Sequence, residues 1–253
     1  NSGNETSMIR GILHYVNKIR LGRYATDFWS CSMAAAVYFF IKKQIHSQKY
    51  RLINNAISTD NYKYDILIRN EVRKNLGLED KYVIGHVGRF QYQKNHEFLI
   101  DIFEAYTRMN NNAHLLLVGQ GENQENIQQK VKELGLWDRV TFTGARMDVN
   151  KLFQAMDIFV FPSRFEGLGM VLIEAQTSGL RCLTTKNKVP YEVNVTGNVE
   201  FEELNENSIE WAHHIEYMEK QPYDRKSCLD LITDAGYDIL KEAEKMESYM
   251  CEE

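Results

Sequence analysis

Two glutamates on either side of a glycine turn are the residues of this sequence best placed to do chemistry. Glu166 lies in the turn, and Glu174 follows in a run of good helix formers that begins at Met170. The short apolar run Ile158–Phe161 before the turn is typical of a buried strand. Strand, glycine turn and helix in this order aim free backbone N–H groups at an anion such as a phosphate. Glu174 would then lie about 7 Å along the helix axis from the helix start.

Two cations follow another expected strand, Tyr82–Val87. Arg89 comes directly after the strand, and Lys94 opens the next helix. Taken alone, both would more simply be solvated surface residues. In open α/β sheets, however, ligands bind beyond the carboxyl ends of the strands, so we expect these cations to meet the turn around Glu166. They would balance the charge of a diphosphate, while the two glutamates would accept hydrogen bonds from hydroxyl groups of the same ligand.

A third strand end carries Gly119 and Gly121. The pair does not complete the fingerprint Gly-x-Gly-x-x-Gly, because Gln124 stands where the third glycine would be. An NAD-type site is therefore disfavoured. By itself a Gly-x-Gly pair indicates only a turn.

Strands and helices alternate from about residue 81 onward, which predicts an α/β fold with a parallel sheet. We expect strands at 82–87, 114–118, 140–142, 158–161, 182–184 and 199–201, and helices at 96–109, 123–134, 149–155, 170–178, 209–219 and 235–249. Ahead of them we expect helices at 8–24, 33–45 and 66–75 and strands at 25–30 and 50–57.

Charge is distributed unevenly along the chain. The net charge is −5, which argues against general nucleic-acid binding, yet residues 1–58 carry eight Lys or Arg against two Asp or Glu. The helix expected at 8–24 is basic and has an apolar stripe, made by Ile9, Ile12, Leu13, Val16 and Ile19. It is either a surface helix packed on a sheet or a contact to an anionic membrane or lipid phosphate. No apolar run reaches the roughly 18 residues that a spanning helix needs.

Four motifs in sequence order carry a resemblance to a known family. They are Gly-Arg-Phe-x-x-x-Lys-Asn at 88–95, Val-Gly-x-Gly at 118–121, Val-Thr-Phe-Thr-Gly at 140–144 and Phe-Pro-Ser-Arg-Phe-Glu-Gly-Leu-Gly-x-x-x-x-Glu-Ala at 161–175. Together they resemble the donor half of retaining GT-B glycosyltransferases, especially the family-four or group 1 class with its bacterial capsule and exopolysaccharide enzymes. The resemblance departs from the family at 179–182, where Gly-Leu-Arg-Cys stands in place of Gly-x-Pro-Val.

The resemblance implies a GT-B fold whose Rossmann-like donor domain spans residues 81–234. Residues 1–58 would be a remnant of an incomplete N-terminal acceptor domain, since most of that domain would lie ahead of Asn1. Residues 59–80 would be a linker and connecting helix, and 235–253 a helix that crosses back toward the N-terminal domain.

The same resemblance implies a role for each candidate residue. Arg89 and Lys94 would hold the nucleotide diphosphate and stabilise the leaving group, Glu166 would contact the transferred hexose, and Glu174 would contact the ribose hydroxyls. The remaining positions are expected to bind the donor: Gly167, Leu168, Gly169 and Met170 at the phosphates or sugar, Phe142, Thr143 and Arg146 at the base, and Gly119 and Gly121 along the cleft.

The expected reaction moves a hexose from a nucleotide diphosphate sugar, most simply a UDP-sugar, to a saccharide or lipid-linked saccharide, with retention. The nucleotide sugar is then a co-substrate, with no cofactor and no metal, and the expected location is the cytoplasm, peripheral to the inner face of the cell membrane. Three alternatives stay open. They are a nucleotide-sugar-binding module without transfer, a GT-B sugar-nucleotide epimerase, and a glycosidase that uses Glu166 and Glu174 as acid and base.

Overall fold

The chain forms two compact units. The computed structural model describes residues 2–205 and 207–251. The larger unit runs Ile57–Asp238, and the smaller unit combines the chain up to Ala56 with the segment from Ile239 onward. Residues 59–80 and 235–238 therefore belong to the larger unit, where the backbone of Ile57 pairs with Tyr237 and Asp238.

A six-stranded parallel sheet forms the centre of the larger unit. Its strand order is β5-β4-β3-β6-β7-β8, where β3 is Tyr82–Val87, β4 Ala113–Val118, β5 Val140–Phe142, β6 Ile158–Phe161, β7 Arg181–Thr185 and β8 Val199–Glu202. The chain starts in the middle at β3, adds β4 and β5 on one side, then crosses to β6 and adds β7 and β8 on the other. This is the Rossmann-like order, and β3 and β6 flank its topological switch point.

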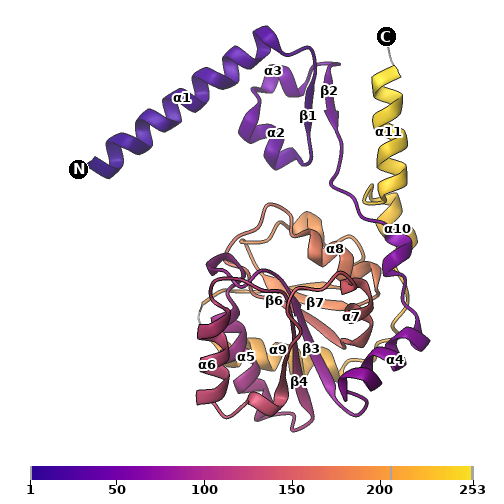
Figure 1. Cartoon of the computed structure of the whole chain (residues 1–253). Coiled ribbons are helices and arrows are strands. Elements are labelled where there is room, and N and C mark those ends of the chain that lie inside the picture. The colour runs from indigo at the N-terminus through magenta and orange to yellow at the C-terminus, as the bar shows by residue number, and fades with distance from the viewer. Residues whose placement is uncertain (1, 206, 252–253) are drawn as a thin grey trace. The chain divides into compact units, whose positions relative to one another are not determined.

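Helices cover both faces of this sheet, as Figure 1 shows. One face packs against α5 (His96–Thr107), α6 (Gln124–Glu133) and α9 (Ser208–Lys220), and the other against α7 (Val149–Ala155), α8 (Met170–Thr177) and α10 (Leu229–Asp234). Within β4, Leu115 and Leu117 point into the first layer and Leu116 into the second. Both faces are buried, which explains why the strands read as continuous apolar runs.

The predicted strands and helices of the larger unit are confirmed within two residues at each end. Helix α10 is an addition, a short helix that the sequence pattern did not indicate. The helix expected from residue 235 begins instead at Ile239, as α11 (Ile239–Cys251). Ala235 ends α10, and Gly236 follows with φ of 82°, a left-handed conformation that no helix continues through.

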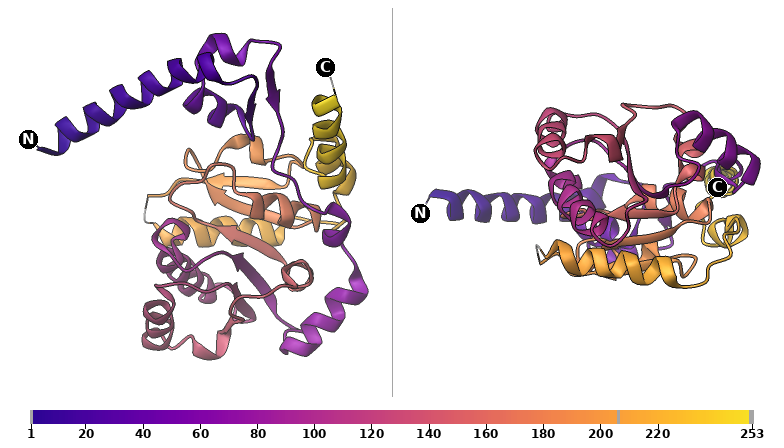
Figure 2. Two further views of the ribbon diagram at one scale, coloured as in Figure 1. Left: turned by 45° about the horizontal axis from the view of Figure 1, so that its top comes forward. Right: turned by 90° about the horizontal axis from the view of Figure 1, so that it is seen from below.

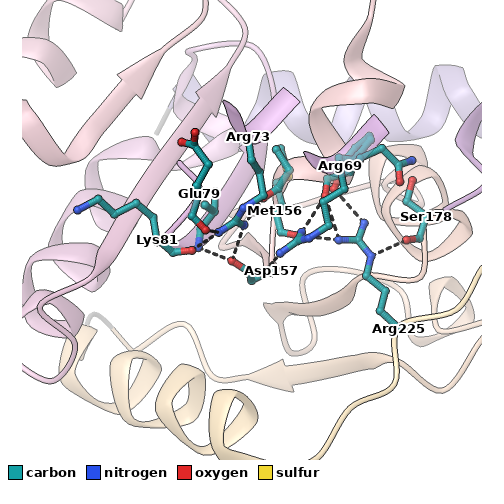
Figure 3. A network of polar contacts seen from close by, with 12 residues as sticks. Arg69, Arg73, Glu79, Lys81, Met156, Asp157, Ser178 and Arg225 are labelled. Atoms are coloured by element: carbon teal, nitrogen blue, oxygen red, sulfur yellow. Dashed lines mark hydrogen bonds and ion pairs between the residues drawn. The ribbon is translucent and has the colours of Figure 1, made fainter. Parts of the chain in front are cut away.

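Three arginines close the C-terminal end of α7, and Figure 3 shows them around Asp157. Arg69 and Arg73 come from α4 (Ile66–Leu76), and Arg225 comes from the segment after α9. Their guanidinium groups donate to the carbonyl oxygens of residues 153–156, and Arg69 and Arg73 also pair with Asp157. These are the carbonyls that a helix leaves without partners, so the cluster anchors α4 and residue 225 to the sheet.

The smaller unit has a two-stranded parallel sheet of β1 (Phe28–Ser30) and β2 (Tyr50–Leu52). Strand β2 ends at Leu52 rather than continuing to residue 57, because β1 ends where Ser32 caps the next helix. Asn54 then donates its backbone N–H to Glu242 of α11, at 2.8 Å. The two further views of Figure 2 show α1 (Ser2–Tyr24), which leads this unit.

The single helix expected at 33–45 is wrong, since the chain forms α2 (Met33–Phe39) and α3 (Lys42–Ile45). Phe40 and Ile41 are extended between them. Phe40 packs edge-on against Phe28 with ring centroids 5.4 Å apart, and Gln44 accepts a hydrogen bond from the backbone of Ile41 at 2.9 Å. Tertiary packing of Phe40 thus overrides a local sequence that has no helix-breaking residue. Across the ranges 2–205 and 207–251, no helix is both long and apolar enough to cross a membrane.

Candidate functional site

The two candidate motifs meet at the switch point of the sheet. Strands β3 and β6 are neighbours, with Ile84 opposite Ile158 and Gly85 opposite Phe159. The loops that follow them, 88–95 and 162–169, therefore start side by side at the carboxyl edge. Their backbones join where Arg164 donates its N–H to the carbonyl of Gln93, at 2.8 Å. The predicted meeting of these two loops is confirmed.

Lys94 and Glu166 form an ion pair across the junction. Lys94 Nζ lies 2.7 Å from Glu166 Oε1, and their side chains are only 16% and 7% exposed. Gln93 donates to the second carboxylate oxygen of Glu166 at 3.2 Å. Lys94 also lies over the ring of Phe161, 4.7 Å from its centroid. Two groups that the sequence assigned to one ligand are thus held together and largely shielded from water.

Arg89 completes the positive side of the site. Its side chain is exposed, and among residues 2–205 and 207–251 it makes no hydrogen bond or ion pair. Its backbone, in contrast, is held on both sides, because Gly88 donates to Val118 at 3.0 Å and Phe90 donates to Gln120 at 3.1 Å. A fixed backbone with a free guanidinium suits the capture of an anionic ligand.

Gly119 and Gly121 let the loop after β4 pack closely against the backbone of the Arg89 loop. Gly119 has φ of 136°, and a Cβ at that position would lie 2.1 Å from the carbonyl oxygen of Gly88. A Cβ on Gly121 would lie 2.4 Å from the carbonyl oxygen of Phe90. The two glycines allow the loops after β3 and β4 to touch at backbone level, a role that turn chemistry alone did not predict. Their expected place along a ligand cleft stays a prediction.

Helix α8 starts at the same edge and presents an open N-terminus. Its N-cap is Gly169, with φ of 86° and no side chain to accept from the first turn. Gly167 is exposed and has open space around its Cα, whereas Leu168 and Met170 are half-buried. Gly169 itself is buried, so contact between the backbone N–H groups of this turn and a ligand beside Glu166 stays a prediction.

Glu174 lies one turn into α8 and is half-buried. Burial raises the pKa of Glu174 to about 7, and the neighbouring hydroxyl of Tyr62, in the 3-10 helix η1 (Thr59–Tyr62), opposes this shift. The sequence pattern found Glu174 but missed Tyr62, since a tyrosine more than a hundred residues away carries no local signal of such a contact.

The three residues expected to edge a base have internal partners. Phe142 stacks on Trp137 with centroids 5.9 Å apart, and the Thr143 hydroxyl donates to the carbonyl of Gly144 at 3.1 Å. Arg146 forms an exposed ion pair with Asp148 at 2.7 Å, and hydrogen bonding to Asp148 raises the pKa of Arg146. Phe142 ends β5 and the other two follow it at the carboxyl edge of the sheet, and the role of all three toward a base stays a prediction.

Beneath the Lys94 loop lies a buried polar cluster that sequence reasoning missed. His86 and His96 pack edge-on with centroids 4.6 Å apart, and desolvation lowers their pKa values to about 4 and about 2. Both imidazoles are thus neutral at pH 7. Asn95, with φ of 56°, donates to the carbonyl of Pro162 at 3.1 Å. The cluster therefore connects the Lys94 loop to the Glu166 loop without adding charge beside the ion pair.

The apolar stripe expected on the first helix falls partly within the described side chains. Leu13, Val16 and Ile19 are exposed on α1, while the side chains of Ile9 and Ile12 lie outside the described residues. The same helix contacts the rest of its unit through Lys18, which donates to the carbonyl of Val37 at 2.7 Å. Whether this stripe meets a membrane stays a prediction.

Comparison with known proteins agrees with the fold and with the family resemblance of the sequence. Residues 68–235 match the family model "Glycosyl transferases group 1", so the chain belongs to this family. The chain is similar to the putative glycosyltransferase EpsF of Bacillus subtilis, with 31% identity over 63% of this chain and 42% of that protein. It is 38% identical to the Vi polysaccharide biosynthesis protein VipC/TviE of Salmonella typhi, over 40% of this chain and 18% of that protein. The chain spans less than half the length of these relatives.

Solved structures of GT-B glycosyltransferases share the fold. HepE of Anabaena, crystallised with UDP and glucose, aligns with a TM-score of 0.72 and 22% identity, over 94% of this chain and 66% of HepE. WaaG, a glycosyltransferase involved in lipopolysaccharide biosynthesis, aligns with a TM-score of 0.64 and 22% identity, over 81% of this chain and 60% of WaaG. The expected α/β class with a Rossmann-like parallel sheet of the GT-B type is confirmed.

Proposed function

We propose that this protein transfers a hexose from a nucleotide diphosphate sugar to a saccharide or lipid-linked saccharide acceptor. The observation that carries the proposal is the Lys94–Glu166 pair at the switch point, with Arg89 and the open N-terminus of α8 beside it. Two cations and a helix N-terminus suit the diphosphate, and a carboxylate at their centre suits sugar hydroxyls. HepE, which shares the fold, has been crystallised with UDP and glucose, so UDP-sugar is our proposed donor.

Charge stabilisation is the chemistry that the described residues supply. As the bond between the anomeric carbon and the phosphate breaks, negative charge grows on the departing diphosphate. In the proposed complex, Lys94, Arg89 and the first N–H groups of α8 would stabilise that charge. Glu166 would exchange part of its contact with Lys94 for a hexose hydroxyl, which orients the sugar next to the group that leaves. Retention of configuration is proposed from family membership.

Surface polysaccharide synthesis is the proposed setting. The relative from Salmonella typhi is named a Vi polysaccharide biosynthesis protein. A relative from Campylobacter jejuni, 30% identical over 57% of this chain and 37% of that protein, is named an N-acetylgalactosaminyltransferase with a diphospho-undecaprenol-linked acceptor. A lipid-linked acceptor would be met at the inner face of the cell membrane, so we propose a cytoplasmic protein peripheral to it. The nucleotide sugar is a co-substrate, and we propose no resident cofactor.

The binding half of the proposal is tested by calorimetric titration with UDP. Arg89→Ala and Lys94→Ala should each weaken UDP binding about tenfold, and the loss should shrink as salt is added because both contacts are between charges. Arg108→Ala is the matched control, since Arg108 is an exposed arginine paired with Glu104 at the other end of α5. Absence of binding to the unaltered chain at millimolar UDP, or equal losses in all three variants, would refute the site.

The transfer half needs a separate measurement. UDP release from a panel of UDP-sugars is followed with and without saccharide and lipid-linked acceptors, and the anomeric configuration of the product is read by NMR. Acceptor-dependent release that Glu166→Gln abolishes supports a transferase. Binding without release under every acceptor would leave a nucleotide-sugar-binding module, and release without acceptor would indicate hydrolysis.

A further inference from the structure

A polar cavity of about 550 Å³ lies between the start of α5 and one face of α6, within the larger unit. The two helices are neighbours on the same side of the sheet, as Figure 1 shows. Pockets for small ligands typically measure about 300–1,000 Å³, so the cavity is large enough to hold one. The residues that we assign to the nucleotide sugar are all described by the structure, and none of them lines this cavity. The cavity is therefore separate from the proposed donor site.

Amide side chains make up much of the polar lining. They are Gln91, Asn95, Asn123, Asn126 and Gln129. Asn123 is the N-cap of α6, and Asn126 and Lys130 follow it three and seven positions later, so that these residues share one face of the helix. Among residues 2–205 and 207–251, the carboxamides of Asn123 and Asn126 have no hydrogen-bond partner. A carboxamide both donates and accepts hydrogen bonds, which suits the hydroxyl groups of a sugar.

The wall of the cavity also holds buried polar atoms that lack a partner within the described part of the chain. They are Asn95 Oδ1, His96 Nε2 and Arg164 Nε. Asn95 and His96 are only 4% and 3% exposed. Buried polar atoms in proteins are nearly always hydrogen-bonded. A ligand rich in hydroxyl groups can satisfy such atoms, either directly or through an ordered water.

The charges around the cavity favour a neutral ligand over an anion. The charged lining residues are two cations and two carboxylates, namely Lys130, Arg164, Glu97 and Glu133. Lys130 pairs with Asp101 at 2.6 Å, and the guanidinium of Arg164 lies over the ring of Tyr92, 4.5 Å from its centroid. The lining thus has no excess of positive charge that would attract a phosphate.

The cavity borders both loops of the candidate active site. Lys94 donates its backbone N–H to the carbonyl of Gln91 at 3.1 Å, and Arg164 donates its own to the carbonyl of Gln93 at 2.8 Å. Tyr92, which is 67% exposed, adds an apolar ring with a polar hydroxyl to the lining. A ligand in the cavity would therefore contact the loops that hold the Lys94–Glu166 pair without occupying the place of the donor.

We propose that this cavity is a second sugar-binding site, which takes a neutral unit of a short saccharide chain. The carboxamides of α6 and of the loop before α5 would recognise the hydroxyl groups. The inference goes beyond the proposed function, because binding of a saccharide here requires neither the nucleotide sugar nor its transfer.

The test is an NMR titration of the full, ¹⁵N-labelled chain with maltotriose, cellotriose and chitotriose, in the absence of nucleotide. At least one trisaccharide should bind, and the signals that shift should cluster at residues 91–97 and 123–133. Asn123→Ala and Asn126→Ala should each weaken this binding about fivefold, the effect of one lost hydrogen bond. Asn126→Trp should abolish it, because the indole would fill the cavity.

Gln128→Ala is the matched control, since Gln128 lies on the same helix but does not line the cavity. It should bind the trisaccharide as the unaltered protein does. Every variant should keep the unaltered affinity for UDP, because the two sites are separate. Absence of binding by all three trisaccharides, displacement of the saccharide by UDP, or shifts at the same residues with inorganic phosphate in place of saccharide overturns the inference. These outcomes leave the proposed function standing, which fails only where the unaltered chain does not bind UDP.

Discussion

The Lys94–Glu166 pair allows a quantitative test of the site that needs no ligand. We expect the two residues to stabilise the fold jointly, and a double-mutant cycle of Lys94→Met, Glu166→Gln and the combined variant measures this coupling. At a separation of 2.7 Å and an effective dielectric constant of about 20, the gross attraction is about 6 kcal/mol. Desolvation of two largely buried groups offsets much of it.

The expected losses differ between the two single variants. Lys94→Met leaves a buried carboxylate with Gln93 as its remaining donor and should cost about 3 kcal/mol of unfolding free energy. Glu166→Gln should cost about 2 kcal/mol, since Lys94 keeps its contact with the ring of Phe161. The combined variant should cost about 3 kcal/mol in total, which corresponds to a coupling of about 2 kcal/mol.

Urea denaturation followed by the fluorescence of the two tryptophans of the larger unit, Trp137 and Trp211, is the suitable assay. Trp211 is fully buried in the larger unit, and a Trp29→Phe background removes the signal of the smaller unit. The pair Lys186–Glu203 is the matched control, because its groups are 2.8 Å apart but 44% and 51% exposed. Its cycle should give a much smaller coupling, because exposed ion pairs are screened by water and salt. Strictly additive losses for Lys94 and Glu166 would refute the pairing on which the site rests.

Three further predictions concern residues that support or surround the site. Gly119→Ala should destabilise the larger unit by about 3 kcal/mol or more, because the new Cβ would clash with the carbonyl oxygen of Gly88. Gly135→Ala is the control, since this glycine has φ of 67° and a Cβ there would meet no atom within 4 Å; it should cost only about 1 kcal/mol. Arg225→Met should cost about 2 kcal/mol in the same urea assay, because the carbonyl oxygens of Phe153 and Met156 lose a charged donor while Arg69 still donates to Met156; a cost no larger than that of Arg108→Met would contradict this. The raised pKa of Glu174 means that the folded state keeps the proton of this carboxyl up to about pH 7, whereas the unfolded chain releases it near pH 4.5. As the pH rises from 4.5 to 7, the unaltered protein should therefore lose stability relative to Glu174→Gln. Parallel plots of stability against pH for the two proteins would contradict the raised pKa.

The sheet and its elements could be predicted because its central strands, such as β4 and β6, are buried on both faces. Ile158–Phe161 is an unbroken apolar run, and the strand has those bounds. This apolar run is visible in the local sequence, and the helix that follows Gly169 could be predicted from local sequence in the same way. The residues Glu166, Lys94 and Arg89 could be placed near one another because parallel strands bring their carboxyl ends to one edge.

What could not be predicted depends on contacts between distant segments. Arg225 reaches carbonyls at 153–156, and Tyr62 reaches Glu174, and in neither case does local spacing encode the partner. The break between α2 and α3 has the same origin, since Phe40 leaves the helix to pack against Phe28. The sequence therefore predicts elements and the edge where they meet, but not the tertiary contacts that hold them there.

The glycine contacts at the carboxyl edge have a consequence for how this site can change. The loops after β3, β4 and β5 are joined backbone to backbone, through Gly88, Gly119 and Gly144. Side chains on these loops, such as Arg89, Gln120 and Glu122, take little part in holding the loops together. Side chains at these positions can therefore be replaced while the main chain keeps its conformation. We therefore expect substitutions at these three positions to leave the fold largely unchanged.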